Sequence, residues 1–112
     1  MHEFSIVTAL LEQVDEQARR HKAQAVRGVR VRIGELSGVE PELVKSAFEI
    51  VRVGTLCAAA DIDIVPVPAV WACAACDRPI EGGGFCCPEC GQTARLVAGD
   101  DLILETIQME VA

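Results

Sequence analysis

The sequence predicts an α+β fold, in which two helices pack on a three-stranded sheet and a zinc-ribbon domain is inserted before the last strand. Three observations lead to this prediction. Two segments carry apolar residues at helical spacing, three segments alternate apolar and polar residues, and five of the six cysteines lie within positions 73–90. We expect one domain to comprise residues 1–68 plus 100–112, and the zinc ribbon to comprise residues 69–99.

Each predicted helix has one apolar face. The first covers residues 4–21, with apolar residues in the pattern Val7, Leu10, Leu11, Val14 and Ala18. The second begins at Pro41, whose fixed φ suits the first helical turn, and its apolar residues are Leu43, Val44, Ala47, Phe48 and Val51. His21 ends the first helix, where we expect it to cap the free carbonyl groups.

The predicted strands alternate in a period of two. Residues 27–33 and 61–67 each place apolar side chains on one face and charged side chains on the other. If these two strands pair, Asp61 and Asp63 would face Arg30 and Arg32 across the ladder. Such pairs add little stability, but they favour one register.

The third predicted strand, residues 102–111, returns to the same sheet. Its apolar residues change parity near Glu105, which indicates a β-bulge. A strand cannot form a sheet alone, so this segment must pair with the two earlier strands. The cysteine region between them is therefore an insertion.

The composition disfavours several classes of protein. Ten basic and seventeen acidic residues give a net charge of −7, which opposes binding to a phosphate backbone. The net charge does not exclude a local basic patch around Arg27, Arg30 and Arg32. No apolar run approaches the roughly 18 residues of a membrane span. Without a basic segment followed by an apolar one at the start of the chain, we expect a cytoplasmic protein.

The cysteine spacing predicts a metal site. Two CxxC pairs separated by ten residues can each turn two sulfurs toward one ion, as in zinc ribbons. The expected zinc ligands are Cys73, Cys76, Cys87 and Cys90. Cys86 is a free neighbour, because its longer gap to Cys90 suits a tight turn less well. Gly91 is expected to adopt a positive φ after the second pair.

Four thiolates would close the coordination sphere of the zinc. With no open position for water, hydrolytic catalysis is not expected there, and the zinc is structural. Metal binding would supply about 10 kcal/mol to fold a lobe this short. Three alternatives remain at this point: iron bound by the same sulfurs, a thiol oxidoreductase using one CxxC pair, or a zinc-ribbon module that binds nucleic acid or protein.

The first three residues form a second candidate metal site. Met1, His2 and Glu3 offer an α-amine, two amide nitrogens and one imidazole, and such nitrogen donors suit square-planar Ni(II) or Cu(II). If the helix begins near Phe4, the amides of His2 and Glu3 are not needed for helical hydrogen bonds. Most histidines at position 2 have no such role, so these residues alone do not assign a function.

The opening MHEFS, the central RIGELSGVEPELVKSAFEIV, and CAAC followed by CCPEC together resemble the HypA/HybF family of nickel metallochaperones. The resemblance extends over essentially the whole chain. It implies a nickel-binding α/β domain, a zinc ribbon and no enzymatic activity. It also implies transferable Ni(II) held by the Met1 amine, His2 and backbone nitrogen near Glu3, and in certain members by an acidic residue at the position of Glu40.

The resemblance also implies partners. Nickel would be delivered to the hydrogenase large-subunit precursor with help from the GTPase HypB, and in some relatives it also reaches urease through urease maturation proteins. The sequence leaves open whether the protein is a monomer or a weak or domain-swapped dimer. Some relatives carry histidines beside the cysteine pairs, and this chain has none. A zinc site that rearranges through such histidines is therefore in doubt here.

Overall fold

The structure is a computed structural model that describes residues 2–80 and 86–111. Its elements are α1 (His2–Arg20), β1 (Ala23–Gly34), α2 (Pro41–Val51), β2 (Asp61–Val67), β3 (Val70–Cys73), β4 (Pro79–Ile80), β5 (Ala94–Ala98) and β6 (Leu102–Val111). They form two sheets, with strand orders β2-β1-β6 and β4-β3-β5. The predicted fold class is confirmed.

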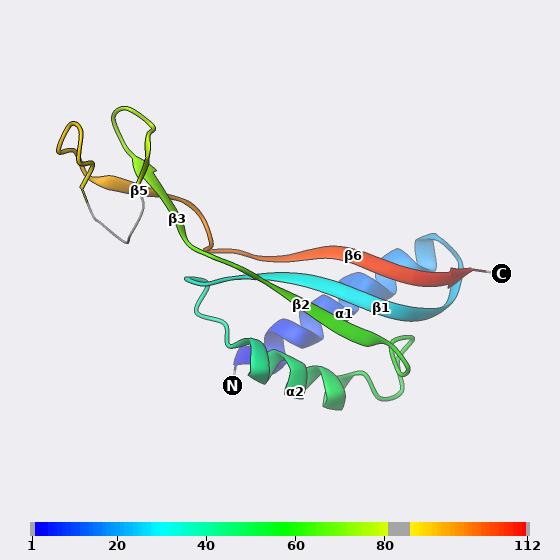
Figure 1. Cartoon of the computed structure of the whole chain (residues 1–112). Helices are drawn as coiled ribbons and strands as arrows, with labels where there is room; N and C mark the ends of the chain where they lie inside the picture. The colour runs from blue at the N-terminus through cyan, green and yellow to red at the C-terminus, as the bar shows by residue number, and fades with distance from the viewer. Residues whose placement is uncertain (1, 81–85, 112) are drawn as a thin grey trace.

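The molecule has two lobes, and each contains one of these sheets (Figure 1). The main lobe contains both helices and the sheet β2-β1-β6, and the cysteine lobe contains β3, β4 and β5. The molecule is elongated, with extents of 57 × 29 × 16 Å. The cysteine lobe lies at one end, and short connections lead into it from β2 and out of it to β6 (Figure 1). The residue boundaries predicted for the two domains remain a prediction.

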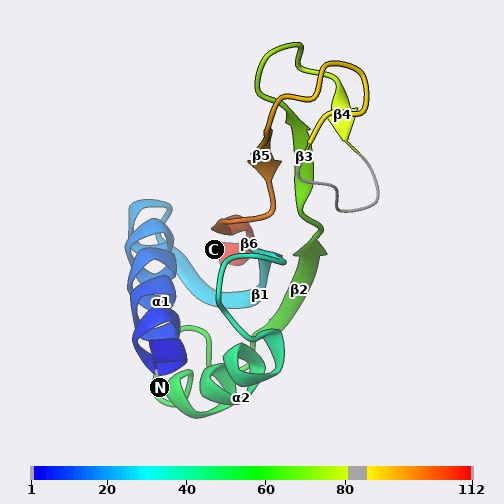
Figure 2. The same ribbon diagram turned by 90° about the vertical axis from the view of Figure 1, so that its left-hand side faces the viewer.

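The core of the main lobe lies between the helices and one face of the sheet (Figure 2). All five residues predicted on the apolar face of α1 are buried, and Phe48 of α2 is the largest fully buried side chain. Leu43 was predicted in the buried face of α2, but it is 50% exposed. It precedes the buried Val44 by about 100° of helical rotation, which turns its side chain outward.

The central strand β1 runs parallel to β2 and antiparallel to β6. The predicted pairing of residues 27–33 with 61–67 is therefore confirmed, with Arg30 opposite Asp63 in the register. The Arg30 Nε donates to Asp63 Oδ2 over 2.9 Å. Arg32 differs from the expectation, because its guanidinium lies 3.8 Å from a Glu105 carboxylate oxygen on β6.

The bulge predicted in β6 is present. Arg30 pairs with Thr106 and Val31 pairs with Leu104, so Glu105 is the extra residue. The bulge changes which residues face the core, and it turns Glu105 to the open face of the sheet, where it meets an arginine.

The ends of α1 differ slightly from the expectation. The helix begins at His2, two residues before Phe4. The amides of His2 and Glu3 are still not needed for helical hydrogen bonds, because the first four N–H groups of any helix lack a helical acceptor. At the other end the His21 Nδ1 lies 3.0 Å from the Gln17 carbonyl oxygen, to which it donates. The predicted capping role of His21 is confirmed.

The cysteine lobe has little apolar surface to bury. Its core contains Cys73, Ile80 and Cys87, with Trp71 and Ala94 packed against it. Two of these five residues are cysteines. Such a core is too small to hold the lobe together without a further link between its segments.

Among the described helices, none is long and apolar enough to cross a membrane.

Candidate metal centres

The structure brings four cysteine sulfurs together in the cysteine lobe. The Sγ atoms of Cys73, Cys76, Cys87 and Cys90 all lie within 4.8 Å of one another. Cys73 Sγ is 3.2 Å from Cys90 Sγ, and Cys76 Sγ is 3.8 Å from Cys87 Sγ. Each short separation joins one CxxC pair to the other, so the cluster ties together segments that are distant in sequence.

These separations fit one tetrahedral zinc ion. Four sulfurs at the usual Zn–S distance of about 2.3 Å stand about 3.8 Å apart. The Cys76–Cys87 separation of 3.8 Å matches that value, the Cys73–Cys90 separation of 3.2 Å is shorter, and all four sulfurs lie within 4.8 Å of one another. The four thiols are the expected donor set for a structural zinc, and they fit the ion without a fifth ligand.

The two CxxC turns have the same backbone hydrogen bonds. In the first turn, the Asp77 N–H donates to the Cys73 carbonyl over 3.0 Å, and the Cys73 N–H donates to Arg78. In the second, the Gly91 N–H donates to Cys87 over 2.9 Å, and the Cys87 N–H donates to Gln92. Each turn therefore presents its two sulfurs in the same way, although the two sequences differ.

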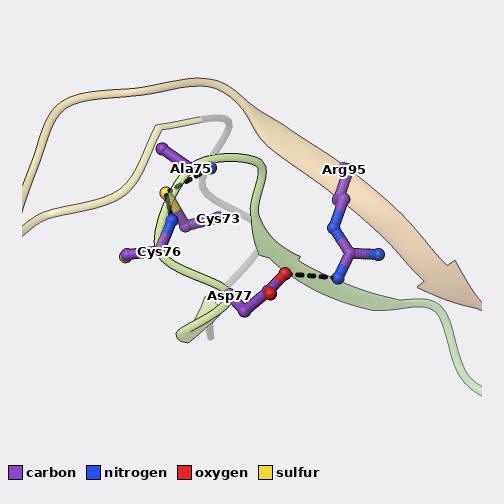
Figure 3. A network of polar contacts seen from close by, with 5 residues as sticks. All are labelled: Cys73, Ala75, Cys76, Asp77 and Arg95. Carbon is purple, nitrogen blue, oxygen red and sulfur yellow. Dashed lines mark hydrogen bonds and ion pairs between the residues drawn. The ribbon is translucent and has the colours of Figure 1, made fainter.

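The residue after each turn has a positive φ. Gly91 has φ 73°, as predicted, and Asp77 has φ 60°. Glycine adopts this conformation without strain, and aspartate tolerates it better than most residues. The Asp77 carboxylate accepts a hydrogen bond from Arg95 on β5 (Figure 3). We did not predict the conformation of Asp77, but its match to Gly91 in the second CxxC turn could have indicated it.

Backbone donors favour a thiolate at Cys73. The N–H groups of Cys76 and Ala75 each lie 3.4 Å from Cys73 Sγ (Figure 3). The hydrogen bond from Cys76 is the main cause that lowers the pKa of Cys73 to about 6. At Cys90 the Gln92 N–H also favours the thiolate, but hydrogen bonding to Cys73, desolvation and the other sulfurs outweigh it and raise the pKa to about 12.

The two remaining cysteines lie apart from the cluster. Cys86 is exposed and forms an isolated β-bridge with Thr93, so its backbone continues the sheet toward the second turn. Cys57 is buried in the core of the main lobe, where desolvation raises the pKa of its thiol. It behaves there as a small apolar side chain.

The N-terminal candidate lies at the start of α1. The His2 side chain is 67% exposed, and its Nε2 lies 3.6 Å from Glu3 Oε2. Glu3 is the one buried charged residue in the part of the chain that the structure describes. Met1 was predicted as a ligand and lies outside the described residues. Within residues 2–80 and 86–111, the cysteine cluster is the sole group of three or more metal-binding side chains, so an N-terminal site would depend on main-chain nitrogen.

Glu40 marks the start of α2. It has an extended backbone with φ −87° and ψ 115°, and its side chain makes no capping hydrogen bond. Its carbonyl accepts from the N–H groups of Leu43 and Val44, each at 3.1 Å. The starts of α1 and α2 lie at the same end of the main lobe (Figures 1 and 2). The Glu40 carboxylate is exposed at that end.

Comparisons with known proteins agree with this architecture. Residues 1–109 match the family model described as hydrogenase/urease nickel incorporation, metallochaperone, hypA. Among named relatives, hydrogenase maturation factor HypA of Wolinella succinogenes is 39% identical, with 98% of this chain and 96% of that protein covered. The HypA of Shewanella oneidensis is 35% identical, with 100% and 98% covered.

Solved structures have the same fold. The solution structure of the nickel metallochaperone HypA from Helicobacter pylori is 29% identical, covers 100% of both chains and has a TM-score of 0.74. Another solution structure of a HypA protein is 28% identical, covers 100% of this chain and 98% of that one, and has a TM-score of 0.81. With the whole-length match to the family model, these similarities show that the chain belongs to the HypA family of nickel-incorporation metallochaperones.

Proposed function

We propose that this protein binds Ni(II) at its N-terminus and delivers it for [NiFe]-hydrogenase maturation in the cytoplasm. The nickel donors are the Met1 amine, the His2 imidazole and backbone nitrogen of His2 and Glu3. The observation that carries the proposal is the family match over residues 1–109, which includes this N-terminal segment. The exposed imidazole of His2 supports it.

The surroundings of His2 suit a nickel site that must release its ion. An exposed imidazole can exchange ligands with a docked partner, whereas a buried one could not. The Glu3 carboxylate lies 3.6 Å from Nε2, so Nδ1 is the ring nitrogen on the side away from this contact and is the one proposed to bind metal. First-turn amides have no helical acceptor, so their deprotonation by nickel would cost the helix little.

The cysteine cluster has a different role in this proposal. Cys73, Cys76, Cys87 and Cys90 hold one Zn(II) permanently, and this ion supplies the folding free energy that the small core of the cysteine lobe lacks. A closed tetrathiolate shell leaves no position for substrate or water. The protein therefore acts as a carrier and not as an enzyme.

The proposed partners follow from the family. The GTPase HypB assists the transfer, and the hydrogenase large-subunit precursor receives the nickel. Urease maturation proteins are a further class of recipient, in line with the family description of hydrogenase/urease nickel incorporation.

Charges on the open face of the main sheet count against the nucleic-acid alternative. Three arginines of β1 could have formed a basic patch there. Each lies within 4 Å of a carboxylate of a neighbouring strand, in the pairs Arg27–Glu110, Arg30–Asp63 and Arg32–Glu105. These carboxylates offset the positive charge that a phosphate backbone would need.

Nickel titration of the untagged, zinc-loaded protein tests the proposal. We expect His2→Ala, or one residue added before Met1, to weaken Ni(II) binding by at least about tenfold and to leave the zinc content unchanged. His21→Ala is the matched control, because it removes the other histidine, which follows the far end of the same helix, and should leave nickel affinity unaltered. Equal affinity in His2→Ala and wild type would refute the N-terminal site. A zinc-free protein with a reversible Cys73–Cys76 disulfide would favour a thiol oxidoreductase instead.

A further inference from the structure

The turn that follows β1 contacts both connections between the two lobes. We propose that Gly34, the last residue of β1, and Gly99 in the connection to β6 interlock the lobes into one rigid unit, and that Glu35 in the turn supports this contact. The inference concerns the relative orientation of the lobes. It goes beyond the proposed nickel function and does not depend on it.

Backbone hydrogen bonds join the end of β1 and the following turn to the connection before β6 and to the last residue of β2. The Gly34 N–H donates to the Asp101 carbonyl over 2.8 Å, and the Leu36 N–H donates to Gly99 over 2.7 Å. The Glu35 N–H donates to the Val67 carbonyl over 2.8 Å. Three consecutive residues thus alternate between the chain that leaves the cysteine lobe and the chain that enters it. The bonds to Gly99 and Asp101 hold the connection out of the cysteine lobe against the main sheet, and the bond to Val67 fixes the end of β2, where the other connection begins.

The backbones approach so closely that side chains are excluded. A Cβ atom on Gly34 would lie 2.3 Å from both the carbonyl carbon and the oxygen of Gly99. A Cβ atom on Gly99 would lie 2.6 Å from Ala69 Cα and 2.8 Å from the Pro68 oxygen. Gly99 also has φ +102°, which side-chain-bearing residues rarely adopt. Each glycine therefore permits a contact between backbone segments that no other residue would allow.

Glu35 adds a side-chain link across the same junction. Its Oε2 accepts a hydrogen bond from the Ala69 N–H over 3.0 Å. Ala69 directly precedes β3, the strand that ends at Cys73. Glu35 is exposed, so water competes for this hydrogen bond. We therefore expect it to contribute less to the junction than the close contact between the glycine backbones.

Measuring the orientation of the lobes in the nickel-free, zinc-loaded protein tests the inference. Residual dipolar couplings from the two lobes of wild type should fit a single alignment tensor. In Gly34→Ala the two lobes should need separate tensors, and the amides of residues 34 and 36 should exchange at least about tenfold faster. Gly28→Ala is the matched control in the same strand, since its Cβ would meet the movable Gln108 side chain at 2.8 Å. It should keep one tensor.

Amide exchange at Ala69 provides a test that does not require Gly34→Ala to fold. Glu35→Ala should speed exchange of this amide by about two- to tenfold, because one hydrogen bond is lost. Glu35→Gln, which keeps an acceptor oxygen, should remain closer to wild type. Glu42→Ala, an exposed glutamate of α2, should have no effect.

Two results would overturn the inference: separate tensors for the lobes of wild type, or one shared tensor in a folded Gly34→Ala protein. Unchanged exchange at Ala69 in Glu35→Ala would remove Glu35 from the junction. Nickel is absent from every sample. A negative result here therefore leaves the proposed nickel site untouched, and loss of that site would not alter this outcome.

Discussion

Arg95 of β5 donates a hydrogen bond to the carboxylate of Asp77, the residue that follows the first CxxC turn with a left-handed backbone. Gly91 has the same conformation after the second turn. Asp77 therefore combines two properties: it tolerates a positive φ, and it ties its turn to the neighbouring strand.

Substitutions at Asp77 should separate these two properties. Asp77→Gly removes the strain of the left-handed backbone but loses an exposed ion pair worth about 0.2–1 kcal/mol, so zinc affinity should change less than about fivefold. Asp77→Ala loses the ion pair and also strains the backbone by about 1–2 kcal/mol. Zinc binding is linked to folding, so its affinity should fall about tenfold or more.

Competition with a chromogenic chelator measures these affinities. Gly91→Ala is the control for backbone strain alone, since a Cβ there meets nothing within 4 Å. Wild-type affinity in Asp77→Ala would show that the left-handed backbone is not required at the first turn.

Cys86 and Cys87 should differ sharply as potential zinc ligands, although they are adjacent. Cys87 is buried in the cluster, whereas Cys86 is exposed outside it. Cys87→Ala should therefore reduce the zinc content to background after chelator challenge, and Cys86→Ala should retain the wild-type content. Elemental analysis of both variants decides the assignment. It would be reversed if Cys86→Ala lost zinc and Cys87→Ala kept it.

Acid should release zinc from the cysteine lobe. The pKa of Cys73 is lowered to about 6, chiefly by the Cys76 N–H. A lowered pKa stabilises the folded lobe at higher pH, and this contribution disappears as the pH falls through the folded-state value. Bound zinc holds the thiolates ionised further, so the release midpoint should lie at or below about pH 6.

Zinc released into an indicator between pH 4 and pH 8 gives this midpoint. Release already above pH 7 would contradict a thiolate at Cys73 that is stabilised by backbone donors.

Phe48 should dominate the stability of the main lobe. The residue is 1% exposed, and truncation of such a side chain to alanine usually costs about 3–5 kcal/mol through lost contacts and a cavity. Ile50 of the same helix is 62% exposed, so Ile50→Ala should change the free energy of unfolding by less than about 0.5 kcal/mol. Urea unfolding of the zinc-loaded protein compares the two, and similar losses would contradict the assigned core.

Local periodicity in the sequence predicts most of the main lobe. The α2 helix covers Pro41–Val51 and β2 covers Asp61–Val67, as the apolar spacing indicates. The change of parity near Glu105 located the bulge in β6. Such patterns are reliable because each residue's position along a helix or strand decides which face it presents to the core.

Long-range pairing was less predictable. Alternation in β1 did not reveal that Arg32 would face Glu105 rather than an aspartate of β2. Both neighbouring strands carry carboxylates at suitable parity, and only the register of the whole sheet selects between them.

The sequence by itself determined which side chains could gather at the candidate sites: two CxxC turns able to share one ion, and nitrogen donors at the chain start. The tertiary structure decided how the parts meet, in the contact of Gly34 with Gly99 and in the ion pair that holds Asp77. The physical reason is the separation in sequence between the residues that interact. Turns and periodic faces depend on neighbours within a few residues, whereas contacts between distant segments depend on the path of the entire chain.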